Sequence, residues 1–250
     1  MSDTKRIYGD KFEINTLKTI ELYNQRAERI SQMQSPYTAV LLGDQNPEYA
    51  EKWDIDEKNR VLPFLNVKKD SSILDLGCGI GRWAETLIPL SGDYTGVDFS
   101  SGMIKSAEER CSELINENTE FICSSVQDYI ETLDSQRKFD VIIISYVCMY
   151  INDSEIEKLI DKLIQHAKKE CSVYFIDTVA LEKRLTLNEI YSQALKSNYS
   201  AIYRTIDELN SLYSHLKEEG FQEISNGFMP KLNNEKAFSE TDRYYTILQR

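Results

Sequence analysis

The sequence of 250 residues lacks a basic segment, a long apolar run and a secretory leader. Acidic residues outnumber basic ones by 41 to 29, the formal net charge is −12, and no Lys/Arg-rich run of five or more occurs. Such a field repels phosphate backbones, which disfavours nucleic acid partners. No apolar run approaches the ~20 residues that span a bilayer, and the first 30 residues show no signal-peptide pattern. We expect a soluble, cytoplasmic protein without membrane partners, for which a homodimer is a candidate assembly.

Paired cysteines are also missing. The five cysteines are scattered, odd in number and never spaced as Cys-x-x-Cys, and the chain has only two histidines. This usage suits buried, reduced thiols better than disulfides or a metal site. We therefore expect no metal ligand among the cysteines, which are Cys78, Cys111, Cys123, Cys148 and Cys171.

Short apolar runs alternate with helical patterns from residue 70 onward. The predicted strands are 72–76, 94–99, 120–123, 139–145 and 172–177, and the predicted helices between them are 82–90, 102–115, 127–133 and 154–169. This β-α order predicts an α/β fold with parallel strands covered by helices on both faces. Two later runs, 221–225 and 244–249, predict an antiparallel pair at the end of the sheet.

Two helix starts follow the capping-box pattern, in which a Ser or Thr and a Glu three residues later satisfy free N–H groups reciprocally. Ser154 with Glu157 predicts one start, and Thr205 with Glu208 predicts the other. Gly220 suits the position just after the end of the second helix.

Three segments lie outside the β-α pattern. Residues 1–69 repeat apolar side chains at helical spacing and predict a helical N-terminal cap. An insertion of about residues 180–204 follows the fifth predicted strand. It lies at the carboxyl-end edge of the sheet, where open α/β sheets bind ligands. Residues 231–240 are predicted to form an exposed loop.

The segment LDLGCGIGRWAE, residues 74–85, places three glycines in five positions between an apolar run and a helical pattern. It predicts a strand, a tight turn and a helix, with backbone N–H groups of the turn exposed to a ligand. Several nucleotide-binding folds use such a turn, so the turn alone does not identify the ligand. The dinucleotide fingerprint requires a small residue where this chain has Arg82. Asp75 precedes the turn, where its carboxylate can fix the loop or accept a hydrogen bond from a cationic ligand.

The stretches ILDLGCGIGRWAETL and YTGVDFSSGMIKSAEER closely resemble the first two motifs of the class I S-adenosylmethionine-dependent methyltransferases. The resemblance continues through FICSSVQDY and FDVIIISYVCMYI to YRTIDELNSLYSHLKEEGFQEI, and so covers roughly residues 70–250. It implies a doubly wound, mostly parallel seven-stranded sheet of the Rossmann-like methyltransferase fold. It further implies an enzyme whose core, residues 70–250, uses S-adenosyl-L-methionine as its cofactor.

The resemblance also implies a set of cofactor-binding residues. Asp98 would accept both ribose hydroxyls, which requires an ionised carboxylate. Ser125 stands where family members often have an aspartate that accepts from the adenine amino group. Structural roles compete with these: Asp98 can cap the next helix, as Ser100 can, and Met103 can fill the core. The full set is Asp75, Gly77, Cys78, Gly79, Gly81, Asp98, Phe99, Ser100, Met103, Ser125, Val126, Ser145, Tyr23 and Arg26.

Methyl transfer requires acceptor, methyl group and sulfur to be held in line, and needs a general base only where the acceptor atom must lose a proton. Tyr146 and Tyr150 follow the fourth strand and Asp177 ends the fifth, so these three are the candidate catalytic residues. The substrate-binding candidates in the cap and insertion, which can equally form an ordinary helix face with solvated charges, are Tyr37, Trp53, Tyr199, Tyr203 and Arg204.

The acceptor class follows from what is absent after the fourth strand. The [ND]-P-P-[YF] motif of the methyltransferases that act on base or glutamine amino groups is replaced by SYVC at residues 145–148. We expect methylation of an O or N atom of a small polar metabolite. Arg26, Arg60, Arg184 and Arg204 motivate a preference for a nucleotide-linked, phosphorylated or sugar precursor of a surface glycan or natural product. Two alternatives stay open: an NAD(P)-dependent oxidoreductase on a related fold, and a non-catalytic cofactor-binding partner subunit.

Overall fold

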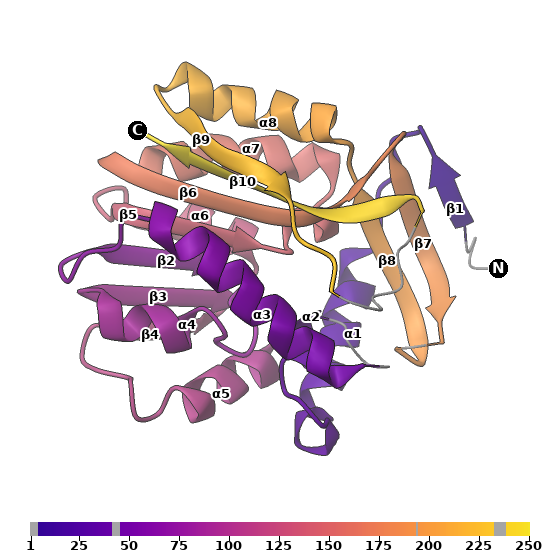
Figure 1. The fold of residues 1–250 in the computed structure, drawn as a ribbon, viewed down its shortest axis with the longest axis horizontal. Coiled ribbons are helices and arrows are strands. Elements are labelled where there is room, and N and C mark those ends of the chain that lie inside the picture. The colour runs from indigo at the N-terminus through magenta and orange to yellow at the C-terminus, as the bar shows by residue number, and fades with distance from the viewer. Residues whose placement is uncertain (1–4, 42–45, 194, 233–238) are drawn as a thin grey trace.

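A seven-stranded sheet forms the centre of the protein (Figure 1). The computed structural model describes residues 5–41, 46–193, 195–232 and 239–250. Five neighbouring strands of this sheet are parallel to one another, and the strand beside them, β10, runs antiparallel to both of its neighbours. The predicted doubly wound, mostly parallel sheet is therefore confirmed. In sheet order the strands are β4 (Thr119–Cys123), β3 (Asp93–Asp98), β2 (Ser72–Leu76), β5 (Phe139–Ser145), β6 (Ala167–Ala180), β10 (Thr241–Gln249) and β9 (Gln222–Phe228).

Alternating side chains of the central strands pack against two different layers of helices. On β5, Ile142 and Ile144 join one buried cluster, whereas Val141 and Ile143 join the other. Because both faces are buried there, the centre of the strand, VIII at residues 141–144, is apolar without interruption. The first cluster includes residues of α6 (Val126–Thr132), α7 (Asp153–His166) and α8 (Ile206–Glu218), and the second includes residues of α3 (Pro47–Val61) and α4 (Ala84–Leu87).

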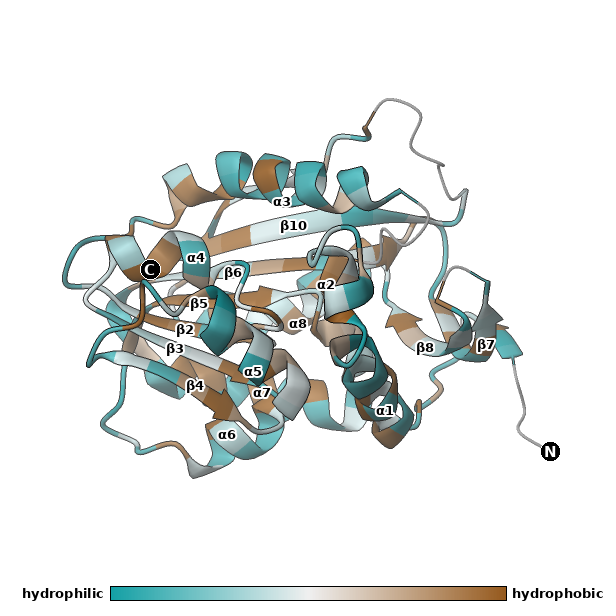
Figure 2. Ribbon diagram, turned by 90° about the horizontal axis from the view of Figure 1, so that it is seen from below, coloured by the Kyte–Doolittle hydropathy of each residue, from teal (hydrophilic) through white to brown (hydrophobic). Residues whose placement is uncertain are grey.

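The helices show the hydropathy expected of elements with one buried face. In Figure 2, hydrophilic and hydrophobic residues alternate along α1 (Thr16–Ala27) and α3, although the buried residues of α3 include the acids Asp54 and Glu57. Helix α5 (Ser101–Arg110) follows β3 and packs against α1. The remaining short helical elements are α2 (Thr38–Leu41), η1 (Ile30–Gln32), η2 (Leu62–Phe64), η3 (Ile88–Leu90) and η4 (Cys148–Tyr150).

One predicted capping box is confirmed and the other is wrong. Thr205 and Glu208 form the reciprocal pair at the start of α8, and Gly220 has φ +90° just beyond its end. Helix α7 instead begins at Asp153, and its cap position is Asn152, two residues before the predicted Ser154. The Asn152 side chain makes no cap bond, because it accepts from Ile14 N at 2.8 Å and donates to Ile14 O at 3.1 Å. It thereby fastens the N-terminal segment to the core.

The N-terminal segment and the insertion meet in a second, smaller sheet. The segment contains the expected helices, but the described part begins with a strand, β1 (Lys5–Tyr8), that was not predicted. The insertion folds as a hairpin of β7 (Leu185–Ser192) and β8 (Ser197–Tyr203). Strand β1 pairs antiparallel with β7, so the two segments form one three-stranded sheet beside the main one (Figure 1).

Two further expectations concern the burial of the cysteines and the presence of a membrane-spanning helix. All five cysteines are free, and four are buried, but Cys123 is exposed at the end of β4, which corrects the expectation that every thiol is buried. Among the described residues, no helix combines the length and the apolar character that crossing a membrane requires. The predicted loop at 231–240 falls mostly on residues 233–238, which lie outside the described residues.

Candidate functional site

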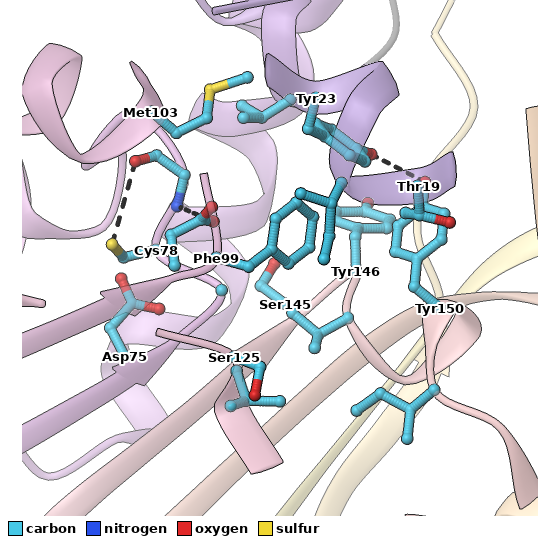
Figure 3. A pocket seen from close by; sticks show the side chains of 18 of the residues that line it. Thr19, Tyr23, Asp75, Cys78, Phe99, Met103, Ser125, Ser145, Tyr146 and Tyr150 are labelled. Carbon is cyan, nitrogen blue, oxygen red and sulfur yellow. Dashed lines mark hydrogen bonds between the residues drawn. The ribbon is translucent and has the colours of Figure 1, made fainter. Parts of the chain in front are cut away.

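A cavity of about 320 Å³ lies at the carboxyl ends of β2, β3 and β5 and is called here the first cavity (Figure 3). Helix α1 closes one side of it with Tyr23, Thr16, Thr19 and Ile20. Thirteen of the predicted site residues line it, namely Tyr23, Asp75, Gly77, Cys78, Gly79, Asp98, Phe99, Met103, Ser125, Val126, Ser145, Tyr146 and Tyr150.

The glycine turn forms the floor of this cavity. Gly77 and Gly79 have φ of +76° and +54°, a region that favours glycine. A Cβ atom on Gly77 would lie 2.2 Å from Val147 Cγ2, so the turn also requires the missing side chain. The expectation of exposed N–H groups is wrong for most of the turn. Gly77 N and Cys78 N donate to Val97 O at 2.7 and 3.0 Å, so the turn offers space to a ligand more than donors.

Asp98 ends β3 with its carboxylate held by the backbone. Its two oxygens accept from Gly79 N at 3.0 Å and from Ser100 N at 2.8 Å. Burial raises the pKa of Asp98 to about 6, and the two backbone hydrogen bonds lower it. The helix cap of α5 is supplied by Ser100, whose side chain accepts from Met103 N at 3.3 Å. Asp98 is therefore available to the cavity, with lone pairs left on both oxygens for two further donors.

Asp75 is a second buried carboxylate that faces the first cavity. Tyr94 donates to its Oδ2 at 2.6 Å. Burial raises the pKa of Asp75 to about 6, whereas the Tyr94 hydrogen bond and the Arg82 charge lower it. Both carboxylates thus have a desolvation cost that a cationic or hydroxyl-bearing ligand would offset.

A carboxylate that the sequence reading missed lies at the far end of the first cavity. Ser125 caps α6 by accepting from Asp128 N at 3.0 Å, and its hydroxyl donates to Asp128 Oδ2 at 2.6 Å. Asp128 and Gln127 line the cavity beside Ser125 and Val126. The serine at the third strand end is therefore accompanied by an acid one helical turn later, a spacing that the segment SSVQD contains.

Arg82 explains why the turn is not followed by a small residue. Its guanidinium is 4% exposed and donates to Asp54 at 2.9 Å and to Glu57 at 2.8 Å, both on α3. It also donates to Ser145 Oγ at 2.6 Å at the end of β5. Burial lowers the pKa of Arg82, but the two carboxylates raise it by more. Neither acid was predicted, because their partner lies far away in the sequence.

The arginines that motivated a phosphorylated acceptor do not line the first cavity. The Arg26 guanidinium is buried and donates to the backbone oxygens of Thr38 and Ala39. Arg204 donates to Cys148 O, Ile151 O and Asp153. The two remaining side chains are also engaged elsewhere, Arg184 with Asp153 and Glu208, and Arg60 over the Tyr245 ring. The cofactor role of Arg26 and the substrate role of Arg204 are thus replaced by structural ones.

Four further predicted residues lie off the cavity lining. Asp177 is buried beneath η4, where its Oδ1 accepts from Met149 N at 3.3 Å and burial raises its pKa to about 7. Tyr37 donates to Glu85 at 2.8 Å. Gly81 packs against α5, since a Cβ there would lie 3.1 Å from Ala107 Cβ. Ser100 acts as the helix cap described above.

A second cavity of about 490 Å³ adjoins the first. Val40, Leu41, Tyr146 and Tyr150 line both, so these four residues form the junction between the two. The second cavity contains Trp53, Tyr199 and Tyr203, three of the predicted substrate-binding residues, and is walled by β7 and β8.

Four phenols from three parts of the chain form a hydrogen-bonded row across this junction. The Tyr23 and Tyr150 hydroxyls lie 2.8 Å apart, and those of Tyr150 and Tyr199 lie 3.1 Å apart. Tyr203 donates to Tyr199 at 3.4 Å. Burial raises the pKa of Tyr203 to about 12 and raises the pKa of Tyr150 and of Tyr199 well above the ordinary value, so these three phenols are neutral near pH 7.

Known proteins are similar to this chain in both sequence and fold. Residues 73–170 match a family model described as a methyltransferase domain. Phosphoethanolamine N-methyltransferase 1 of Zea mays is 32% identical over 129 residues, which are 50% of this chain and 25% of that protein. The chain thus spans about a quarter of the length of the first curated relatives that it matches.

Two solved structures share the fold at low identity. Haemonchus contortus phosphoethanolamine N-methyltransferase 1, in complex with phosphoethanolamine and S-adenosylhomocysteine, aligns with a TM-score of 0.63 and 14% identity, covering 94% of this chain and 50% of that one. The DhpI-SAM-HEP complex aligns with a TM-score of 0.61 and 19% identity, covering 96% and 100%. Together with the strand order and the matched segment, this shows that residues 73–170 match a methyltransferase domain and that the chain has the fold of these structures.

Proposed function

We propose that this protein transfers a methyl group from S-adenosylmethionine to an O or N atom of a small molecule, with the donor in the first cavity and the acceptor in the second. The observation that carries the proposal is the junction at Val40, Leu41, Tyr146 and Tyr150, which both cavities share. A group that leaves the first cavity at the junction enters the second directly past these four side chains. The bound cofactor supplies an electrophilic methyl group on a sulfonium.

The side chains of the first cavity fit such a donor. The Asp98 carboxylate has lone pairs for a ribose diol, and Asp75 would face the ammonium of the methionine portion. Ser125 and Asp128 would offer acceptors to the adenine amino group. The raised pKa values of Asp75 and Asp98 support this assignment, because both carboxylates are desolvated and face the cavity.

At the junction the chain's own work is to position the acceptor and exclude water. Among the described residues, the four that line both cavities include no carboxylate and no imidazole. The phenols of Tyr146 and Tyr150 have raised pKa values, chiefly because of burial, and stay protonated. This supports an acceptor atom whose lone pair is available without a strong general base, such as a neutral amine or an acidic hydroxyl.

Calorimetric titration with S-adenosylhomocysteine tests the donor assignment. Asp98→Asn removes the charge from the proposed diol contacts, which are worth about 1.5–3 kcal/mol, so its dissociation constant should rise about 10- to 100-fold. Asp93→Asn is the matched control, because Asp93 lies at the other end of β3 and does not line the first cavity. Equal affinities of Asp98→Asn and the unchanged protein would contradict the assignment. Release of S-adenosylhomocysteine from S-adenosylmethionine only when an acceptor is present would separate an enzyme from a non-catalytic binding subunit.

A further inference from the structure

The walls of the second cavity are mainly apolar and aromatic. Aliphatic side chains come from η4 and the β7–β8 hairpin, and aromatic ones come from α3, the junction and the hairpin. The side chains that form these walls are Met149, Leu185, Leu187, Ile190 and Leu195, with Trp53, Tyr146, Tyr150, Tyr191, Tyr199 and Tyr203. Such a lining favours a ligand that buries carbon surface.

The phenols add little hydrogen-bonding capacity to these walls. Tyr150 bridges the hydroxyls of Tyr23 and Tyr199, and Tyr203 donates to Tyr199, so the hydroxyl groups bind largely to one another. The O–H donors of this row are therefore largely used within it, and what the oxygens leave for a ligand is acceptor capacity. The rings therefore act mainly as apolar surface.

The charged side chains of the second cavity are already engaged. Arg6 pairs with Glu240, and Lys231 pairs with Asp242 at 3.1 Å. The Arg243 guanidinium lies 4.5 Å from the centre of the Trp53 ring and donates to the Pro230 carbonyl oxygen at 3.2 Å. A phosphate dianion would have to compete with two carboxylates for Arg6 and Lys231, whereas an uncharged ring would leave both pairs intact.

We infer that the second cavity binds a methyl acceptor with an apolar, ring-bearing body, rather than a fully polar phosphoester as small as phosphoethanolamine. This inference rests on the proposed function, because it takes the second cavity as the acceptor site. Its volume of about 490 Å³ is within the range of pockets that hold ring-containing small molecules. The O or N nucleophile would be presented at the junction, with the ring against the hairpin.

Ligand-observed saturation-transfer NMR on the protein saturated with S-adenosylhomocysteine tests this inference. The two probes are 2-naphthol, which carries a ring and one hydroxyl, and phosphoethanolamine. We expect 2-naphthol to bind and phosphoethanolamine not to bind. Binding of phosphoethanolamine alone, or of neither probe, would overturn the inference while leaving the proposed function in place. Failure of S-adenosylhomocysteine itself to bind would instead count against the proposed function.

Substitutions at Leu187 on β7 test whether 2-naphthol binds in the second cavity. Leu187→Trp fills the cavity and should weaken 2-naphthol binding about tenfold or more, whereas Leu187→Ala enlarges it and should weaken binding a few-fold. Leu181→Trp is the matched control, because Leu181 is 43% exposed and lines neither cavity. Unchanged S-adenosylhomocysteine affinity would show that each variant is folded. Equal 2-naphthol binding by Leu187→Trp and Leu181→Trp would refute the placement, and Leu187→Ala keeps that test available if the tryptophan variant does not fold.

Discussion

The hydroxyl groups of Tyr23 and Tyr150 lie 2.8 Å apart, although the two residues are 127 positions apart in the chain. Their rings meet edge to face, with centroids 5.6 Å apart and an interplanar angle of 78°. Tyr150 also reaches Tyr199 of the hairpin at 3.1 Å. The N-terminal helix, the sheet and the insertion are therefore joined at one phenol, between the two cavities.

Tyr150→Phe should destabilise the protein by about 1–3 kcal/mol, because it removes a buried hydroxyl that bonds to two other buried phenols. Urea unfolding gives the free energy. Tyr129→Phe, a phenol on α6 outside both cavities, serves as the control and should change stability by less than about 0.5 kcal/mol. Equal losses in the two variants would show that the row of phenols contributes no stability.

Affinity for S-adenosylhomocysteine should fall as the pH is lowered from 7 to 5. Burial raises the pKa of Asp75 and of Asp98 to about 6, and a ligand that favours their ionised forms lowers both pKa values and releases protons on binding. One such group would weaken binding about tenfold one unit below its pKa. Calorimetry in two buffers of different ionisation enthalpy measures both the affinity and the proton release. Asp98→Asn should reduce the pH dependence, and an unchanged slope in that variant would exclude Asp98 as its source.

Gly77→Ala should destabilise the protein far more than Gly220→Ala. Both residues have positive φ, +76° and +90°, so both substitutions carry a backbone cost of about 1 kcal/mol. Only at Gly77 does the new Cβ meet an atom, Val147 Cγ2 at 2.2 Å, whereas nothing lies within 4 Å at Gly220. Thermal unfolding of the two variants gives the comparison. Similar melting temperatures would mean that the turn moves aside at little cost.

Glu57→Gln should destabilise the protein by about 3 kcal/mol or more, because it leaves the buried Arg82 with less compensating charge. Glu57 Oε1 also accepts from Tyr174 at 2.9 Å and from Ser145 at 3.2 Å. The substitution therefore also weakens contacts to Ser145, which lines the first cavity. Glu51→Gln, at an exposed position of the same helix, is the control. Urea unfolding of both variants checks the difference, and a stable Glu57→Gln protein would show that Asp54 alone balances the guanidinium.

The parts of the fold that sequence reading found are those encoded locally. The strands 72–76 and 139–145 were predicted to the residue, because each is a short, mainly apolar run, the first followed by the glycine turn and the second ending at Ser145. The start of α7 was misplaced, because the Asn152 side chain serves a tertiary contact with Ile14 that no local pattern reveals. Strand β1 was missed for the same reason, since its partner is β7.

The site divides in the same way. The glycine turn and Asp98 lie in two motifs that are close together in the sequence. The sequence therefore placed both at the same end of the sheet, where they line the first cavity. The arginines were misjudged, because the carboxylates and carbonyls that engage Arg26 and Arg204 come from other segments. Glu57 was overlooked, because its partner Arg82 lies beyond the N-terminal segment.

The matched domain segment, residues 73–170, supplies only Tyr146, Met149 and Tyr150 to the lining of the second cavity. Apart from Thr178 of β6, every other side chain of that lining comes from the N-terminal segment, the β7–β8 hairpin or residues 231–243 near the C-terminus. With the acceptor in the second cavity, as proposed, mutations in those peripheral parts would alter substrate preference during evolution while the residues that line the first cavity stay constant. Relatives with the same donor motifs need not share a substrate, and exchanging the hairpin between two of them is a direct way to transfer one.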